Sequence, residues 1–298
     1  MKFLVTGGAG FIGSHLACRL SPLGEVIVLD DLTSGRESNL QGIPCRRIRG
    51  SILDSAKLNE ALQGVSHVFH LAAMVSVPKS VQQPALCHNI NVEGTRRVLE
   101  SAAAAGVKRL VLASSCAVYG NEPTLPKTED LPPTPLSPYA LSKWEGEKLC
   151  ASATFPAVAL RFFNVYGPRQ DPQGPYAAAV PKFLEAAAAG TPLTLHGDGL
   201  QTRDFVFVED VTAALLHVAT HSPCQGVYNV ASGHSVSILE LAQTILAVTG
   251  SKSSVQSAPA RAADVRHSSA SIQRLSATGW QPKFTLAAGL KKILSPAG

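Results

Sequence analysis

The sequence has 298 residues, 45% of them hydrophobic and 16% charged, which is typical of a globular protein with a substantial core. This length accommodates one large α/β domain, alone or with a smaller lobe. No apolar run has the length of a membrane span or a signal peptide, so we expect a cytoplasmic protein without a membrane partner. The net charge of +5 comes from dispersed Lys and Arg, which argues against nucleic acid and favours a phosphate-bearing small molecule.

The six cysteines lie far apart in the sequence. They form no CxxC pair and no Cys/His cluster with the spacing of metal ligands. We therefore expect reduced, mostly structural thiols and no metal site.

The first half of the chain alternates short apolar segments with helical ones. Short buried strands are expected at Lys2–Thr6, Glu25–Leu29, Val65–Leu71 and Arg109–Ala113. Helices are expected across Ser14–Leu20 and from about Val92 and Leu141. Strands that alternate with helices predict an α/β fold, in which a parallel sheet is connected by right-handed crossovers.

Two alanine runs mark further helix ends. Ala102–Ala105 and Ala186–Ala189 are each followed by glycine, which predicts helices that end on a C-cap glycine. In the second half Pro and Gly become more frequent. This change predicts long binding loops at Gly167–Gly174 and Gly190–Gly199, on a second lobe.

A glycine-rich turn follows the first predicted strand. Gly7–Gly13 has the spacing GxxGxxG, which permits a tight turn and a close approach of the backbone to a pyrophosphate. The next helix, expected to be capped near Ser14, would present its N–H groups to the phosphates. Asp30 ends the second strand, where a carboxylate accepts hydrogen bonds from ribose hydroxyls and repels a 2′-phosphate. The pattern favours NAD over NADP, although Arg36 is a possible counter-signal.

Tyr139 and Lys143 are four residues apart on a predicted helix, and therefore on one face of it. A Tyr side chain ordinarily titrates near pH ~10. An ammonium held beside the phenol would favour the phenolate and so lower its pKa. The pair is therefore a candidate general base that works near neutral pH.

These motifs occur together with Asn91 before Gly94-Thr95, and with Ser114-Ser115. In this combination the chain resembles the extended short-chain dehydrogenase/reductases, and within them the sugar-nucleotide epimerase branch of the NAD-dependent epimerase/dehydratase family. The resemblance covers nearly the full length and includes the segments Leu160–Gln170, Gly197–Phe205 and Arg261–Ser268.

The resemblance implies a Rossmann-type doubly wound parallel sheet in residues 1–163, which binds NAD. Residues 164–298 would form a smaller C-terminal α/β lobe that binds a UDP-sugar, with part of 200–230 packing back onto the first domain. It also implies a homodimer. The family usually has Asp where this chain has Ser51, so we expect a neutral and weaker contact with the adenine amine.

The family's site positions carry over residue by residue. The implied catalytic residues are Tyr139, Lys143 and Ser115. The implied cofactor-binding residues are Gly7, Gly10, Phe11, Ile12, Gly13, Asp30, Asp31, Ser34, Ser51, Ile52, Leu71, Ala72, Ala73, Asn91, Tyr139, Lys143 and Phe162. The implied substrate-binding residues are Ser115, Asn164, Gln170, Ala178, Thr194, His196, Arg203, Arg261, Asp264 and Ser268.

Within the branch, the residue after Ser115 separates the chemistries. Members that dehydrate or decarboxylate place an acid there, whereas this chain has Cys116, which favours reversible hydride transfer without elimination. The expected reaction is 4-epimerisation of a UDP-hexose through a 4-keto sugar. Tyr139 would exchange the proton of the 4′-hydroxyl, Ser115 would hydrogen-bond the same oxygen, and Lys143 would lower the Tyr pKa.

Several substrate and function alternatives stay open. Ser268 is small where relatives with a bulky aromatic exclude an N-acetyl arm, so N-acetylated and plain hexoses both fit. UDP-glucuronate is an alternative substrate because His267 or Arg266 could meet its carboxylate. Ser-Ser-Cys before YxxxK also resembles NADPH-dependent GDP-sugar epimerase/reductases, with Cys116 as the acid. A non-catalytic NAD sensor on the same fold is a further alternative.

Overall fold

The computed structural model describes residues 1–298 except 173–177, 222, 261–264 and 296–298. The chain divides into two compact units. The first consists of Met1–Glu122, Glu129–Phe162 and Val211–Asn229. The second consists of Pro123–Thr128, Phe163–Asp210 and Val230–Gly298.

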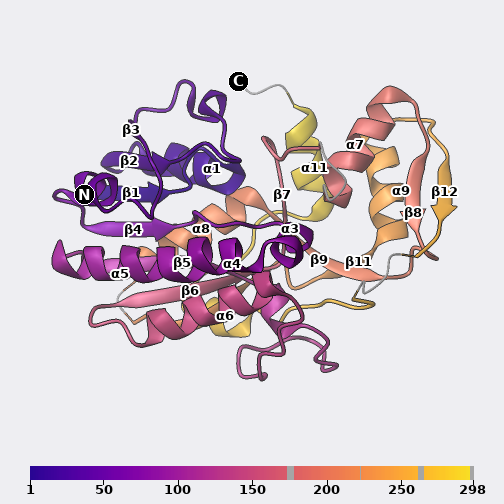
Figure 1. Ribbon diagram of the computed structural model, residues 1–298. Helices are drawn as coiled ribbons and strands as arrows, with labels where there is room; N and C mark the ends of the chain where they lie inside the picture. The colour runs from indigo at the N-terminus through magenta and orange to yellow at the C-terminus, as the bar shows by residue number, and fades with distance from the viewer. Residues whose placement is uncertain (173–177, 222, 261–264, 296–298) are drawn as a thin grey trace. The chain divides into compact units, whose positions relative to one another are not determined.

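The first unit is built on a seven-stranded sheet with the order β10-β6-β5-β4-β1-β2-β3 (Figure 1). Its strands are β1 (Lys2–Thr6), β2 (Glu25–Asp30), β3 (Arg46–Arg49), β4 (His67–His70), β5 (Arg109–Ser115), β6 (Ala157–Phe162) and β10 (Gly226–Val230). Every pairing from β3 to β6 is parallel. The predicted Rossmann-type parallel sheet is therefore confirmed, and its C-terminal strand ends form one edge, where such folds bind ligands.

Helices cover both faces of this sheet. On one face lie α1 (Phe11–Leu20) and the part of α8 (Val208–Thr220) that belongs to the first unit, joined by a 3.0 Å hydrogen bond from Arg19 Nε to Thr212 Oγ1. On the other face lie α2 (Ser55–Leu62), α5 (Gly94–Ala104) and α6 (Pro138–Ala151). Shorter elements are α3 (Val77–Gln82), α4 (Pro84–His88), a π-helical turn at Asn89–Glu93, and 3-10 turns at Glu37–Leu40 and Cys116–Tyr119.

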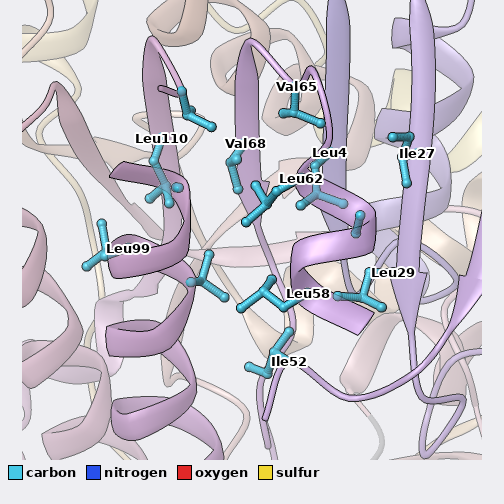
Figure 2. Packing of buried hydrophobic residues seen from close by; sticks show 14 of the residues in the cluster. Leu4, Ile27, Leu29, Ile52, Leu58, Leu62, Val65, Val68, Leu99 and Leu110 are labelled. Carbon is cyan, nitrogen blue, oxygen red and sulfur yellow. The ribbon is translucent and has the colours of Figure 1, made fainter. Parts of the chain in front are cut away.

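The core between the sheet and the second of these helical layers is aliphatic (Figure 2). Leu4, Val68 and Leu110 point from neighbouring strands toward Leu58 of α2 and Leu99 of α5. Full burial of such a side chain stabilises the fold by roughly 1.5–3 kcal/mol. This packing holds the strand ends, and the loops that follow them, in fixed positions.

The second unit contains two small sheets. The three-stranded sheet has the order β11-β9-β7, and the two-stranded sheet pairs β12 with β8 in parallel. Its strands are β7 (Asn164–Tyr166), β8 (Leu193–His196), β9 (Thr202–Phe207), β11 (Ser235–Ser237) and β12 (Val255–Ala258). Its helices are α7 (Ala179–Ala189), α9 (Ile238–Thr249), α10 (Gln273–Ser276) and α11 (Leu286–Leu294).

The predicted strands of the first half and both alanine-run helices are confirmed. Gly106 and Gly190 follow the two helices with φ of +69°, the left-handed conformation of a C-cap glycine. The loop predicted at Gly190–Gly199 is wrong in part, because it contains β8, whose apolar Leu193 and Leu195 are buried. Within the described ranges, the chain contains no helix with the length and apolar character needed to span a bilayer.

The predicted cap at Ser14 is also wrong. Helix α1 begins at Phe11 with the extended Gly10 as its N-cap, and Ser14 lies inside the helix, where its hydroxyl donates to the Phe11 carbonyl at 3.0 Å. The glycine turn lets the helix start earlier, so its first-turn N–H groups lie directly after the loop.

Candidate active site

Two of the loop glycines are required by the packing of the chain itself. Gly7 has φ of +70°, and a Cβ there would lie 2.7 Å from the backbone nitrogen of Ala72. A Cβ on Gly13 would collide with the carbonyl oxygen of Gly7. The first glycine therefore makes the turn and lets the backbone of Leu71 and Ala72 approach, and the last lets α1 pack against the loop.

Gly10 is different, because the protein does not fill the space beside it. Among the described residues other than its chain neighbours, a Cβ on Gly10 would come within 4 Å of the Gly7 carbonyl oxygen alone, at 3.2 Å. Helix α1 begins there without a side-chain cap on its first N–H groups. An open backbone face beside uncapped helix N–H groups fits the diphosphate of a dinucleotide, whose charge the helix N-terminus stabilises.

Asp30 lies at the end of β2, the position expected for the residue that binds the ribose. Its Oδ2 accepts from the Ala9 N–H at 2.9 Å and its Oδ1 from the Leu32 N–H at 2.8 Å. Burial raises the pKa of this carboxyl, and the two N–H donors oppose that change. Gly35 packs so closely that an added Cβ would lie 2.8 Å from Oδ1. Each oxygen keeps acceptor capacity for a hydroxyl, which fits an unphosphorylated ribose.

Other predicted cofactor residues also belong to the first unit. Asp31 accepts from the Thr33 N–H at 2.9 Å, and the Ser51 hydroxyl accepts from the Leu53 N–H at 3.2 Å. Ile52 is buried, and Phe162 ends β6 opposite Ser115 in the strand register. The Ser51 hydroxyl therefore has one partner within the chain, and the weaker adenine contact stays a prediction.

Tyr139, Lys143 and Ser115 are brought together in the first unit. Helix α6 begins at Pro138, one residue before Tyr139, because the Ser137 hydroxyl caps the Ala140 N–H. A hydrogen bond joins the Ser115 and Tyr139 side chains. Lys143 places its ammonium 5.8 Å from the centre of the Tyr139 ring. The three predicted catalytic residues thus form one cluster at the C-terminal end of β5.

The electrostatics of the cluster correct one expectation. Burial raises the pKa of Tyr139 to about 12, and the hydrogen bond from Ser115 only partly offsets it. Burial lowers the pKa of Lys143 to about 8. In the protein alone, burial thus shifts the pKa of Tyr139 in the direction opposite to the one expected from Lys143, because desolvation disfavours the phenolate. Its ammonium instead donates to the Ala113 carbonyl at 2.7 Å.

Asn91 is fully engaged by the protein. Its Oδ1 accepts from the Met74 N–H at 2.7 Å, and its Nδ2 donates to the Met74 carbonyl and to Ser142 Oγ, at 3.0 and 2.9 Å. These bonds tie the segment after β4 to α6, the helix that carries Tyr139. Asn91 therefore connects the segment after β4 to α6 through its side chain.

Sequence reasoning missed a buried chain of hydrogen bonds beneath the cofactor loop. His70 Nδ1 lies 2.7 Å from Thr6 Oγ1 and His70 Nε2 lies 3.0 Å from Thr95 Oγ1. Because the Thr95 hydroxyl already donates to the Asn91 carbonyl at 2.6 Å, it accepts from Nε2–H. Burial lowers the pKa of His70 to about 3, so the ring is neutral. The sequence signal that could have indicated this hydrogen-bond chain is a histidine at the end of a buried strand.

The second unit contains a pocket of about 740 Å³, a size that suits a small-molecule ligand. Five predicted substrate residues line it: Asn164, Ala178, Thr194, His196 and Arg203. Phe183 and Phe205 supply apolar walls. Arg203 donates from Nη1 to the Thr202 carbonyl at 2.7 Å, and Asn164 donates to the Asp204 carbonyl at 3.0 Å.

The remaining predicted substrate residues are placed differently. Gln170 donates to the Val165 carbonyl at 3.2 Å, and Ser268 is held by its N–H on the Thr202 carbonyl at 3.1 Å; neither lines the pocket. Arg261 and Asp264 lie outside the described residues. Sequence reasoning missed Lys182 and Gln201 in the pocket lining, because no motif marks either position.

The family comparison agrees with this arrangement. The model of the NAD dependent epimerase/dehydratase family matches residues 3–231, more than half of the chain. The chain belongs to this family. Its cofactor is therefore NAD, in line with the open phosphate loop and with Asp30.

Individual relatives are similar over nearly their full length. A UDP-glucose 4-epimerase of Mycolicibacterium smegmatis is 40% identical over 313 residues, which covers 99% of this chain and 97% of the relative. The structure of a UDP-N-acetylglucosamine 4-epimerase from Methanobrevibacter ruminantium M1, in complex with UDP-N-acetylmuramic acid, superposes with a TM-score of 0.93 at 36% identity, covering 98% of this chain and 96% of that one. A Thermus thermophilus UDP-glucose 4-epimerase in complex with NAD has a TM-score of 0.90 at 37% identity, with 99% and 98% covered.

Proposed function

We propose that the protein is an NAD-dependent 4-epimerase of UDP-hexoses. The cluster of Tyr139, Ser115 and Lys143 carries this proposal, since it supplies a proton-exchanging hydroxyl, a second hydrogen-bonding hydroxyl and a cation in one place. The relatives named UDP-glucose and UDP-N-acetylglucosamine 4-epimerase support the same reaction.

In this reaction the chain's own residues handle the proton and the substrate. Bound NAD supplies the hydride acceptor and, once reduced, the hydride donor. Tyr139 takes the proton of the sugar 4′-hydroxyl as carbon 4 becomes a ketone, and returns it when the alcohol re-forms. Ser115 holds the same oxygen through a hydrogen bond. Lys143, fixed by the Ala113 carbonyl, keeps a positive charge beside the phenol and so stabilises its ionised form.

The pocket of the second unit is assigned to the UDP moiety. Arg203 provides a guanidinium for the diphosphate, and Asn164 lies in the same wall. Phe183 and Thr194 are available to the uracil ring. Arg261 and Asp264 are proposed for the second phosphate contact and the uridine ribose, on the family resemblance alone.

Within the UDP-sugars, the observations favour a neutral hexose. Arg266, one candidate partner for a glucuronate carboxylate, is already bound by Asp198 through two hydrogen bonds of 2.7 Å. His267 is hydrogen-bonded to the Thr202 hydroxyl at 3.2 Å. On the family resemblance, the small Ser268 stands at the position that admits an N-acetyl arm, so the UDP-N-acetylglucosamine/UDP-N-acetylgalactosamine pair is our first choice, with UDP-glucose/UDP-galactose next.

Two other functions are less well supported. A GDP-sugar epimerase/reductase would use NADPH, whose 2′-phosphate the Asp30 carboxylate repels. A non-catalytic NAD sensor would have no use for the assembled Tyr139–Ser115 pair and its lysine. Dehydration and decarboxylation lack their acid, because Cys116 follows Ser115.

We also propose that the subunit forms a homodimer through α3, α4 and α6, which contact one another in the first unit. These helices expose Val81 (62%), Val77, Leu86 and Leu141 (41% each), an unusual number of large apolar side chains for a solvated face. Light scattering after gel filtration should give a dimer mass, and V81K with L141K should give a monomer. A monomeric wild-type protein would refute the interface.

The epimerase proposal is tested with purified protein and no added cofactor. UDP-N-acetylglucosamine, UDP-glucose and UDP-glucuronate are incubated separately, and the 4-epimers are followed by proton NMR. Conversion supports an epimerase that retains its NAD, and the relative rates name the sugar. If a folded protein converts none of them even with NAD supplied, the proposal fails.

A further inference from the structure

A buried ion pair stands behind the catalytic cluster. Glu147 of α6 and Arg161 of β6 face each other in the first unit with side chains only 5% and 4% exposed. Arg161 Nε donates to Glu147 Oε1 at 2.9 Å and Nη2 donates to Oε2 at 2.8 Å. Such two-point pairs fix orientation as well as distance.

The pair is anchored on β5 next to the catalytic serine. The Ser114 hydroxyl donates to Glu147 Oε1 at 2.5 Å, and Ser114 is the register partner of Arg161 on the neighbouring strand. Both oxygens of Glu147 therefore have partners. Arg161 also contacts the 3-10 turn Cys116–Tyr119, since its guanidinium lies 4.7 Å from the centre of the Tyr119 ring. The Ser115 side chain caps this turn.

These contacts connect α6 to β5 at three points. Three consecutive residues of β5 hold three residues of α6: the Ala113 carbonyl binds Lys143, Ser114 binds Glu147, and Ser115 binds Tyr139. On α6 the three partners are spaced four residues apart, so they follow one face of the helix. Of these three contacts, the one between Ser114 and Glu147 contains no predicted catalytic residue.

We infer that Glu147 and Arg161 are positioning residues for proton transfer, which set the rotation and height of α6 so that Tyr139 meets Ser115. This inference rests on the proposed epimerase function. A pair of apolar side chains could fill the same volume, but it would not fix the position of the helix along the strand. An error of about 1 Å in a reacting group can cost on the order of 100-fold in rate.

The first test compares E147Q with the wild type in the full-length protein, with 4-epimerisation followed by NMR. We expect kcat to fall by roughly tenfold to 100-fold while KM stays within about twofold, because the substrate pocket is untouched. The control is E145Q, the same change on the same helix, where Glu145 faces His88 at 3.8 Å instead of β5. Its kcat should stay near that of the wild type.

A double variant separates positioning from stability. E147L with R161M replaces the ion pair by apolar side chains, which commonly preserves or raises stability. We expect its urea midpoint to recover toward the wild-type value while kcat stays low. If kcat recovers together with the midpoint, the pair is merely structural and the inference is wrong.

A milder variant covers the case in which the double variant does not fold. S114A removes the hydrogen bond from Ser114 to Glu147 and leaves the ion pair intact, so we expect a near-normal urea midpoint with kcat lowered severalfold. Unchanged kcat in S114A would contradict the proposed positioning of α6 by these contacts. An inactive wild type would instead refute the epimerase proposal, so the two failures are distinguishable.

Discussion

The ammonium of Lys143 donates a 2.7 Å hydrogen bond to the backbone carbonyl of Ala113, two residues before Ser115 on β5. This bond holds a buried positive charge near Tyr139, and no carboxylate in the described part of the chain is its direct partner. A carboxylate in contact would neutralise the charge that the phenolate needs. The arrangement therefore keeps the cation available to the reacting group while giving it a fixed position.

The phenol of Tyr139 is expected to be essential for turnover and dispensable for the fold. Y139F removes the proton-exchanging oxygen and leaves the ring in its buried place, so kcat should fall by at least ~1,000-fold with an unchanged urea midpoint. NMR of the product and absorbance of retained cofactor are the measurements. S115A, which loses only the helping hydrogen bond, should keep more activity than Y139F. Wild-type turnover by Y139F would contradict the mechanism.

The loop glycines should separate into folding and binding positions. G13A drives a Cβ into the Gly7 carbonyl, so it should lower the urea midpoint or prevent folding. G10A meets only one protein atom, at 3.2 Å, and should fold normally. Because the new methyl occupies the side left open for the diphosphate, NAD affinity of G10A should fall by roughly tenfold or more. Calorimetric titration with NAD, alongside denaturation, distinguishes the two effects.

His70 should make the protein sensitive to acid. Its pKa in the folded state is about 3, below the ordinary value of 6.5. The unfolded chain therefore binds the proton first, so the stabilisation is present above pH 6.5 and is lost as the pH falls toward 3. The loss reaches up to about 5 kcal/mol for a shift of this size.

Urea denaturation of the wild type and H70Q between pH 7 and pH 4 tests this expectation. H70Q should be less stable at pH 7, because it changes a buried hydrogen-bond chain. Its stability should nevertheless change less with pH than that of the wild type. Parallel curves for the two proteins would show that His70 does not cause the acid sensitivity.

Arg203 should contribute to substrate affinity more than to chemistry. R203Q removes the guanidinium from the pocket, so KM for the UDP-sugar should rise by about tenfold to 100-fold with a smaller change in kcat. R266Q is a matched control, because Arg266 is exposed and its guanidinium is paired with the exposed Asp198. Equal effects of the two variants on KM would argue against the assigned phosphate contact.

The local sequence was sufficient for the elements that depend on neighbouring residues. The strand at Lys2–Thr6 and the glycine turn follow from apolar runs and from glycine's tolerance of positive φ, both short-range properties. The spacing of Tyr139 and Lys143 likewise placed them on one helical face, because the helix repeat is fixed. The cofactor class came from motifs in their order along the chain.

Tertiary structure decided what depends on groups far apart in the sequence. The pKa of Tyr139 could not be predicted, because desolvation depends on what surrounds the phenol, and burial outweighs the effect expected from Lys143. The start of α1 at Phe11, with Gly10 as its N-cap, was not predicted either, because it depends on how the glycine loop folds. The Glu147–Arg161 pair had no sequence signal, since charged residues usually face solvent. Only strand pairing and helix packing together bring their side chains into contact inside the first unit.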